Sequence, residues 1–198
     1  MDILTKTVSS EEVIKGSRFL SELIPCSSQS EARDILKAQK AKYADATHVV
    51  HAFVVGNGAE ICGMSDDGEP SGTSGRPTLD VLKGRNCTNV ILTITRWFGG
   101  TLLGTGGLVK AYSGGAKQVI AKADEEQAFQ PLVAKTSFIF SSDYSLFKLI
   151  KLKLQDFHIW NQTEDFGTDI TISGEIQSDE YETLGSILSD ISNGKIKL

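Results

Sequence analysis

Three carboxylates in one turn-rich segment could carry chemistry in this sequence. Asp66, Asp67 and Glu69 lie within residues 65–75, downstream of a predicted strand that carries His48 and His51. Carboxylates of this kind bind hard divalent cations or act as acid and base groups. Residues three apart on a strand point to opposite faces, so the two histidines cannot readily share a metal ion. We therefore predict no metal site, although a metal-dependent, peptidase-like hydrolase of small molecules that uses the three carboxylates remains an alternative.

A glycine-rich run follows the next predicted strand. Five of the nine residues from 99 to 107 are glycine, and apolar residues then recur at helical spacing from Leu108 onward. Backbone N–H groups in a loop between a strand and a helix can bind phosphate. Thr105 and Gly106 stand where a P-loop has Lys followed by Ser or Thr, and the run also lacks the last glycine of G-x-G-x-x-G. Two interpretations of these glycines stay open. They contact an anion, or they only permit tight turns and close packing.

Basic residues flank this glycine run. Arg96 ends the strand before it, Lys110 lies in the first turns of the helix after it, and we expect Arg76 nearby. Such a cluster suits a phosphate group. The alternative is that Arg96 pairs with one of the three carboxylates and only fixes their loop. The predicted phosphate- or RNA-binding residues are Arg76, Arg96, Gly99, Gly100, Gly104, Gly106, Gly107 and Lys110, with Ser65, Asp66, Asp67, Gly68 and Glu69 forming the loop beside them.

No residue pattern indicates an enzyme mechanism. The sequence lacks G-x-S-x-G and any convincing succession of Ser, His and Asp, so we assign no catalytic residue, metal or cofactor. The 198 residues carry a net charge of -5, which argues against a protein that coats nucleic acid non-specifically. All five arginines precede residue 130, so we expect any anion-binding surface in that part.

The amino terminus and the apolar runs indicate where in the cell the protein is located. No apolar stretch approaches the roughly 20 residues that a membrane span needs. The first residues lack a basic start followed by an apolar core, and the three cysteines are unevenly spaced. These features predict a cytoplasmic protein with free thiols and no membrane association.

Periodicity divides the chain into two domains near Pro131. The first domain, residues 1–131, is predicted to contain strands at 8–14, 17–25, 47–55, 59–64 and 89–95. Its helices are predicted from a capping box at Ser28 and Glu31 to about Tyr43, from Pro77 to Gly84, and from Leu108 to about Ala123. The second domain, residues 132–198, reads as strand 136–140, helix 144–154, strands 159–163 and 168–173, helix 181–191 and a closing strand at 196–198. That βαββαβ order predicts a ferredoxin-like fold.

The carboxylate-rich segment and the glycine-rich run also resemble a known family. Residues 65–73, SDDGEPSGT, and residues 96–112, RWFGGTLLGTGGLVKAY, closely resemble the YigZ/Impact family. The likeness extends from Gly16 through the glycine-run helix, and residues 136–198 resemble the C-terminal domain of its bacterial members. Many relatives carry tyrosine in place of Trp97, a change that keeps an aromatic ring.

The resemblance implies an α+β protein of two domains. The N-terminal domain would be similar to domain IV of elongation factor G, of the ribosomal small-subunit protein five domain-2-like type, and the C-terminal domain would be ferredoxin-like. Family members are linked to translation regulation. We therefore predict a non-enzymatic, cytoplasmic, nucleic-acid-binding protein that associates with RNA, the ribosome or a translation factor. A protein-interaction module that acts through the second domain is a further possibility.

Overall fold

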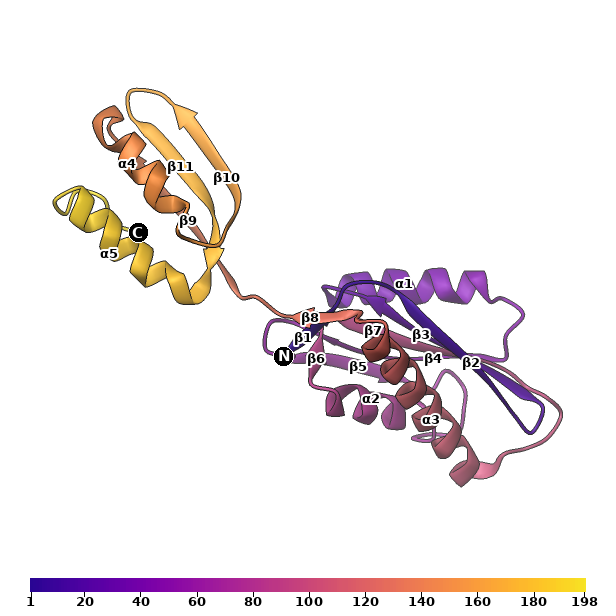
Figure 1. Cartoon of the computed structure of the whole chain (residues 1–198). Helices are drawn as coiled ribbons and strands as arrows, with labels where there is room; N and C mark the ends of the chain where they lie inside the picture. The colour runs from indigo at the N-terminus through magenta and orange to yellow at the C-terminus, as the bar shows by residue number, and fades with distance from the viewer. The chain divides into compact units, whose positions relative to one another are not determined.

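The computed structural model describes all residues from 1 to 198. The chain divides into two compact units, Met1–Leu132 and Val133–Leu198, each with its own sheet and hydrophobic core (Figure 1). None of the helices is both long and apolar enough to cross a lipid bilayer.

Unit 1 is built on a five-stranded sheet in which every neighbouring pair is antiparallel. Its strands are ordered β2 (Val8–Ile14), β3 (Ser17–Pro25), β7 (Val90–Trp97), β4 (His48–Val55) and β5 (Ile61–Ser65). β7 lies at the centre of the sheet, which explains why its sequence VILTIT is apolar or β-branched at every position and wholly buried. Its carboxyl end delivers Arg96 and Trp97 to the edge where the glycine run begins.

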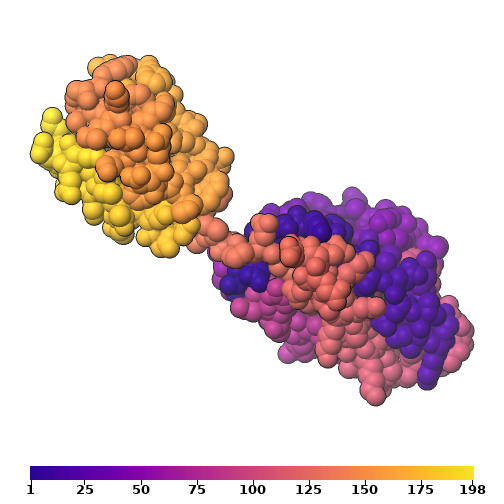
Figure 2. Space-filling view, in the orientation of Figure 1, coloured from indigo at the N-terminus to yellow at the C-terminus, as the bar shows by residue number.

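Helices cover both faces of this sheet. α1 (Gln29–Lys42) packs on one face through Ala32 and Ile35, while α2 (Gly75–Gly84) and α3 (Gly104–Glu125) pack on the other. Alternate residues of β7 serve the two faces, so Ile91 contacts the α1 side while Leu92 and Ile94 face α2 and α3. In the space-filling view the indigo N-terminal strands adjoin the salmon-coloured α3 on one face of unit 1 (Figure 2).

The local signals at α1 act as predicted. Ser28 caps the helix by accepting a hydrogen bond from the Glu31 amide, and Glu31 Oε2 accepts one in return from the Ser27 amide at 2.7 Å. Three short strands were not predicted, namely β1 (Asp2–Leu4), β6 (Cys87–Thr88) and β8 (Phe129–Pro131). They form a second small sheet in the order β6-β1-β8, and pairings between such distant short segments leave no periodic pattern to read.

The start of α3 differs from the sequence prediction. The helix begins at Gly104, so Gly104, Gly106 and Gly107 belong to its first turn rather than to the loop before it. Glycine has a low helix propensity, which is why the pattern pointed to a later start at Leu108. Tertiary packing of the following apolar residues compensates for that low propensity.

Unit 2 contains a three-stranded antiparallel sheet and two helices. The strands are ordered β10 (Ile159–Phe166), β11 (Ile170–Gln177) and β9 (Lys135–Ser142). Helices α4 (Tyr144–Leu154) and α5 (Tyr181–Ile191) bury Ile150, Leu154, Leu184 and Leu188, and a 3-10 turn, η1 (Ser178–Glu180), precedes α5. The predicted closing strand at 196–198 was wrong. Ile196 is buried in the core, but its amide donates to Ser192 Oγ instead of to a neighbouring strand.

Candidate nucleic-acid interface

Asp66 fixes the beginning of α2. Its Oδ1 accepts hydrogen bonds from the amides of Ser74 and Gly75 and from Ser74 Oγ at 2.7 Å, and its Oδ2 accepts one from the Gly72 amide. These donors include orphan N–H groups of the helix start, which the Ser74 side chain does not cap. Burial alone would raise the pKa of Asp66, but the hydrogen bonds from Gly72, Ser74 and Gly75 outweigh it and lower that pKa. Asp66 is thus a helix cap that acts from eight residues upstream.

Asp67 ties the same loop to β4 and α1. One carboxylate oxygen accepts a hydrogen bond from the Val49 amide at 2.7 Å, and the other pairs with Lys40 Nζ. The backbone of Asp67 has a φ of +44°, and its carbonyl oxygen lies 2.7 Å from His48 Nδ1. Because a carbonyl oxygen can only accept, His48 Nδ1 carries the proton of that hydrogen bond.

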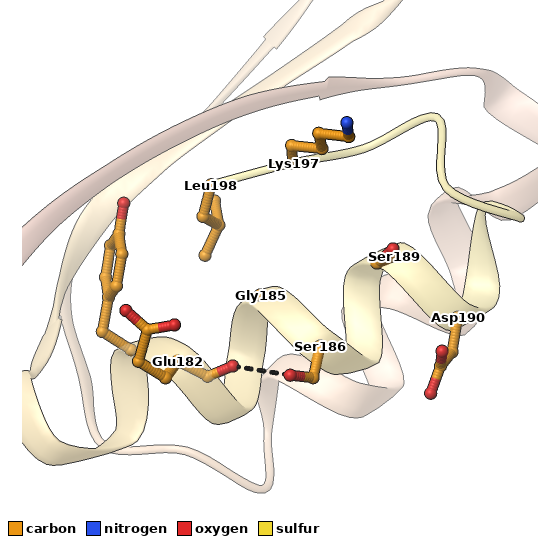
Figure 3. Close-up of a pocket in the computed structure, with 8 residues that line it drawn as sticks. Glu182, Gly185, Ser186, Ser189, Asp190, Lys197 and Leu198 are labelled. Atoms are coloured by element: carbon orange, nitrogen blue, oxygen red, sulfur yellow. Dashed lines mark hydrogen bonds between the residues drawn. The ribbon is translucent and has the colours of Figure 1, made fainter.

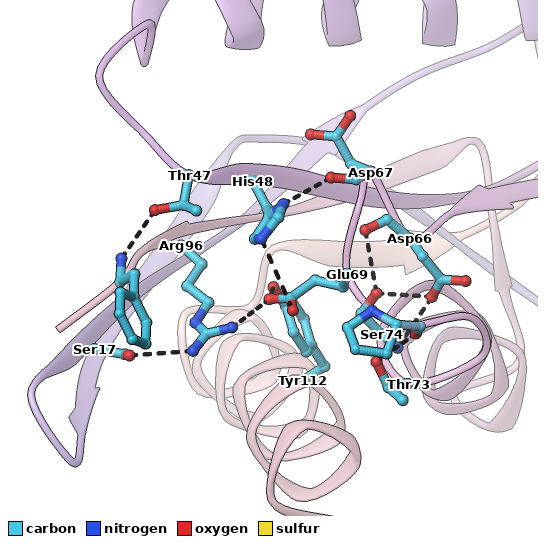
Figure 4. A network of polar contacts seen from close by, with 12 residues as sticks. Ser17, Thr47, His48, Asp66, Asp67, Glu69, Thr73, Ser74, Arg96 and Tyr112 are labelled. Atoms are coloured by element: carbon cyan, nitrogen blue, oxygen red, sulfur yellow. Dashed lines mark hydrogen bonds and ion pairs between the residues drawn. The ribbon is translucent and has the colours of Figure 1, made fainter. Parts of the chain in front are cut away.

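Glu69 lies at the centre of a buried polar network (Figure 4). Its Oε1 accepts hydrogen bonds from Arg96 Nη1 at 2.6 Å and from the Tyr112 hydroxyl at 2.7 Å, and Arg96 Nη2 lies 3.3 Å from Ser17 Oγ. Burial raises the pKa of Tyr112, and the adjacent Glu69 raises it further. Strands β3 and β7, helix α3 and the acidic loop, residues 65–75, therefore meet at one ion pair, in which Arg96 is 5% exposed.

This arrangement decides how the three predicted carboxylates are used. The side chains of Asp66, Asp67 and Glu69 each accept hydrogen bonds or ion pairs from their own surroundings, and they do not converge on a shared point. Their contacts favour a role in shaping the loop over a role as metal ligands. The interpretation in which Arg96 pairs with a carboxylate and fixes the loop corresponds to what is observed, with Glu69 as the partner.

The first glycines of the run allow a close backbone approach. A Cβ atom on Gly99 would lie 1.9 Å from the carbonyl carbon of Gly16, in the turn between β2 and β3. The Gly99 amide donates to Ser17 Oγ at 3.2 Å, and Gly100 has a φ of +86°. The glycine segment is therefore pressed against the β2–β3 turn, and only glycine at position 99 permits that contact.

The start of α3 exposes unpaired backbone donors. The amides of Gly104, Thr105 and Gly106 precede the first intrahelical hydrogen bond, and Leu103 at the cap position offers no side-chain acceptor. Beside them lies a cavity of about 410 Å³ that Lys15, Gly106, Gly107 and Lys110 help to line. Neither lysine has a carboxylate within ion-pair distance. Free N–H groups and two free ammonium groups thus share one edge of unit 1.

The predicted basic residues are only partly brought together. Lys110 lies on this edge, whereas Arg96 lines a neighbouring cavity and is neutralised by Glu69. Arg76 projects from α2, where it pairs with Asp80 at 2.8 Å and lines neither cavity. Sequence reasoning did not identify Lys15, whose only local signal is the Lys15-Gly16 turn between two strands, with φ values of +47° and +84°.

Unit 2 also contains a groove. It has a volume of about 490 Å³ and lies between α5 and the C-terminal residues Lys197 and Leu198 (Figure 3). Its lining mixes acidic, basic and small side chains, and the hydroxyl of Ser186 is already satisfied by the Glu182 carbonyl one turn earlier. No buried, unpaired polar group faces this groove, so we assign no site to it.

Comparison with known proteins identifies the family. The family model described as the Impact N-terminal domain matches residues 15–120, more than half of the chain and all of the edge just described. The chain belongs to the Impact family. An Impact family member from Haemophilus influenzae is 32% identical over 188 residues, covering 94% of this chain and 89% of that protein. Impact family member YigZ from Escherichia coli is 31% identical over 189 residues, covering 94% and 91% respectively.

A solved structure extends the likeness to the whole chain. A crystal structure described as that of a hypothetical protein superposes with a TM-score of 0.71 at 31% identity, covering 99% of this chain and 94% of the other. The Impact resemblance found in the sequence motifs is thereby confirmed, as is a mixed α+β architecture. Both motif segments of the Impact domain lie at the site, since residues 65–73 shape the acidic loop and residues 96–112 supply Arg96, the glycines and Lys110.

Proposed function

We propose that this protein is a non-enzymatic, cytoplasmic binding protein of the translation machinery, and that unit 1 binds RNA phosphates at the start of α3. The observation that carries the proposal is the set of unpaired amides of Gly104, Thr105 and Gly106 beside the unpaired ammonium groups of Lys15 and Lys110. Helix N-termini attract anions through free N–H groups and the helix dipole, and lysines add a salt-dependent attraction for phosphate.

The acidic loop does not oppose this binding. Glu69 is paired with Arg96, Asp67 with Lys40, and Asp66 accepts hydrogen bonds at the positive end of α2. A charge compensated within a few ångströms projects little field onto a neighbouring surface. The three carboxylates beside the proposed site are therefore largely neutralised by their contacts.

Family membership supports a partner in the translation machinery. The Impact family is linked to translation regulation, and its N-terminal domain is expected to be similar to domain IV of elongation factor G. The order β10-β11-β9 in unit 2 also agrees with a ferredoxin-like sheet that lacks its last strand. These likenesses support RNA, the ribosome or a translation factor as the partner, with residues 1–131 and 132–198 as the two domains.

Co-sedimentation with ribosomes and with free RNA tests the proposal. The double variant Lys15→Ala/Lys110→Ala is compared with the wild type between about 50 mM and about 200 mM salt. Loss of two phosphate contacts should weaken binding to all sequences and reduce the slope of log K against log[salt] by about 2. Lys83→Ala is the matched control, because Lys83 is an exposed lysine on α2 that forms no ion pair and lines neither cavity. Salt-independent binding, or equal loss in the control, would contradict the proposal.

Arg96 is not suitable for this test. Its side chain is buried and paired, so Arg96→Ala would leave Glu69 without its cation and disturb the fold. The two exposed lysines report on binding without that complication.

A further inference from the structure

A second cavity adjoins the phosphate-binding edge and has a different character. Its volume is about 410 Å³, and it shares Leu103 with the cavity that Lys15 and Lys110 line. The rim is apolar, with Phe98 46% exposed and Leu102 82% exposed, and Leu108 and Pro70 continue the apolar wall. A volume in this range is ordinary for a small organic ligand, and exposed apolar side chains at its mouth are costly unless something covers them.

His48 and Glu69, whose side chains face each other in Figure 4, also line this cavity. Glu69 Oε1 is occupied by Arg96 and Tyr112, but Glu69 Oε2 accepts no hydrogen bond although the side chain is only 3% exposed. Nδ1 of His48 donates to the Asp67 carbonyl, and the tautomer with its only ring proton on Nδ1 leaves Nε2 as an acceptor. Nε2 lies 3.9 Å from Glu69 Oε2, within ion-pair distance when the ring is protonated. In that tautomer the two atoms are adjacent acceptors, one of them on a buried carboxylate, and they fit a ligand that brings two adjacent N–H groups.

Backbone donors also line this cavity. Gly104 and Thr105 line it, and their amides are among the unpaired N–H groups at the start of α3. The lining of one cavity thus combines acceptors, exposed apolar side chains and backbone donors that suit an anion. A nucleotide has these three complementary parts, since it consists of a hydrogen-bonding base edge, a flat ring and a phosphate.

We propose that this cavity binds an unstacked guanine of single-stranded RNA, an inference that rests on the proposed function. Guanine is the standard base whose Watson–Crick edge presents two adjacent donors, N1–H and the 2-amino group, which would face Glu69 Oε2 and His48 Nε2. The ring packs against Phe98 and Leu102, and the adjoining phosphate lies at the start of α3. Sequence-specific RNA recognition commonly uses such splayed bases, stacked on side chains and bound through their edges.

Fluorescence anisotropy with labelled RNA pentamers tests the proposal. The probes are UUGUU, UUAUU and a third pentamer with inosine, which keeps N1–H and lacks the 2-amino group, at the central position. We expect the guanine probe to bind at least about tenfold more tightly than the adenine probe, with inosine between them. In Phe98→Ala/Leu102→Ala the three probes should bind equally. Val13→Ala is the control, because Val13 is 66% exposed and lines neither cavity.

The outcomes separate this inference from the proposed function. One outcome is that the wild type binds all three probes equally while the salt slope still depends on Lys15 and Lys110. That result overturns the guanine pocket and leaves the proposed RNA binding intact. If no RNA binds, free guanosine is titrated while the ring signals of His48 are followed by NMR. A shift of those signals that is absent in Phe98→Ala/Leu102→Ala then supports the base pocket against a failed proposed function, and an unchanged spectrum overturns both.

Discussion

The acidic loop and the glycine segment of unit 1 make an instructive pair, since both are short, contain several glycines and line the same cavity. In the acidic loop, residues 65–75, the three carboxylates accept hydrogen bonds from β4, from the start of α2 and from Arg96. In the glycine segment, residues 98–107, the amides of Gly104, Thr105 and Gly106 have no protein partner, and the side chains of Phe98 and Leu102 are exposed. Hydrogen-bond satisfaction, rather than composition, thus distinguishes the loop that holds the fold from the segment that we propose to bind a ligand.

Among substitutions in these two segments, Glu69→Ala should lower the stability of the protein most. The substitution leaves Arg96 buried without its anion and the Tyr112 hydroxyl without its acceptor, so the free energy of unfolding should fall by about 4 kcal/mol. Urea denaturation followed by circular dichroism measures the change. The double variant Glu69→Leu/Arg96→Met removes both charges and should lose less; a double variant that is as unstable as the single one would mean that the ion pair does not explain the effect.

Gly99→Ala should have the next largest effect, now from the glycine segment. Its Cβ would overlap the Gly16 backbone, and the backbone must move to relieve the overlap, at a cost of about 3 kcal/mol. Gly100→Ala is the comparison, because a Cβ there meets no atom within 4 Å, although its φ of +86° adds some strain. Thermal unfolding of both variants measures the difference, and equal melting temperatures would argue against the close contact with the β2–β3 turn.

Asp66→Ala should lower the free energy of unfolding by a smaller amount, about 2 kcal/mol at neutral pH, because α2 loses its cap. The folded-state pKa of Asp66 is lowered, so the stabilisation by its carboxylate is present above the unfolded pKa and is lost as the pH falls through the folded value. The difference in stability between wild type and variant should therefore be greatest above about pH 4, near the reference pKa of aspartate, and shrink in more acid solution. A difference that grows on acidification would contradict the capping role.

Substitution of the two lysines proposed to bind phosphate should have the smallest effect on stability. Lys15→Ala and Lys110→Ala remove side chains that pair with no carboxylate, so the free energy of unfolding should change by less than about 0.5 kcal/mol. The same urea titrations measure it. A loss of 1 kcal/mol or more would show that these lysines stabilise the fold and would weaken the contrast between the two segments.

Local signals in the sequence placed most of the fold correctly. β2, β3, α4 and α5 have the predicted bounds, and α1 begins after the predicted capping box, because amphipathic periodicity and caps involve residues close in sequence. β1, β6 and β8 were missed because strands of two or three residues form through distant partners. The α3 start was placed too late because three glycines obscure the helical pattern, and 196–198 did not form a strand although Ile196 is buried as an apolar residue should be.

For the site, the sequence by itself determined the family, the two motif segments and the presence of Arg96, Lys110 and three carboxylates near one another. Only the tertiary structure decided which of these charges is free. Glu69 neutralises Arg96 across 27 positions of the chain, Asp80 engages Arg76, and the β2–β3 turn brings Lys15 to the start of α3. Pairing of charged groups depends on distances of a few ångströms between segments far apart in sequence, and such distances are set when the sheet and its helices pack.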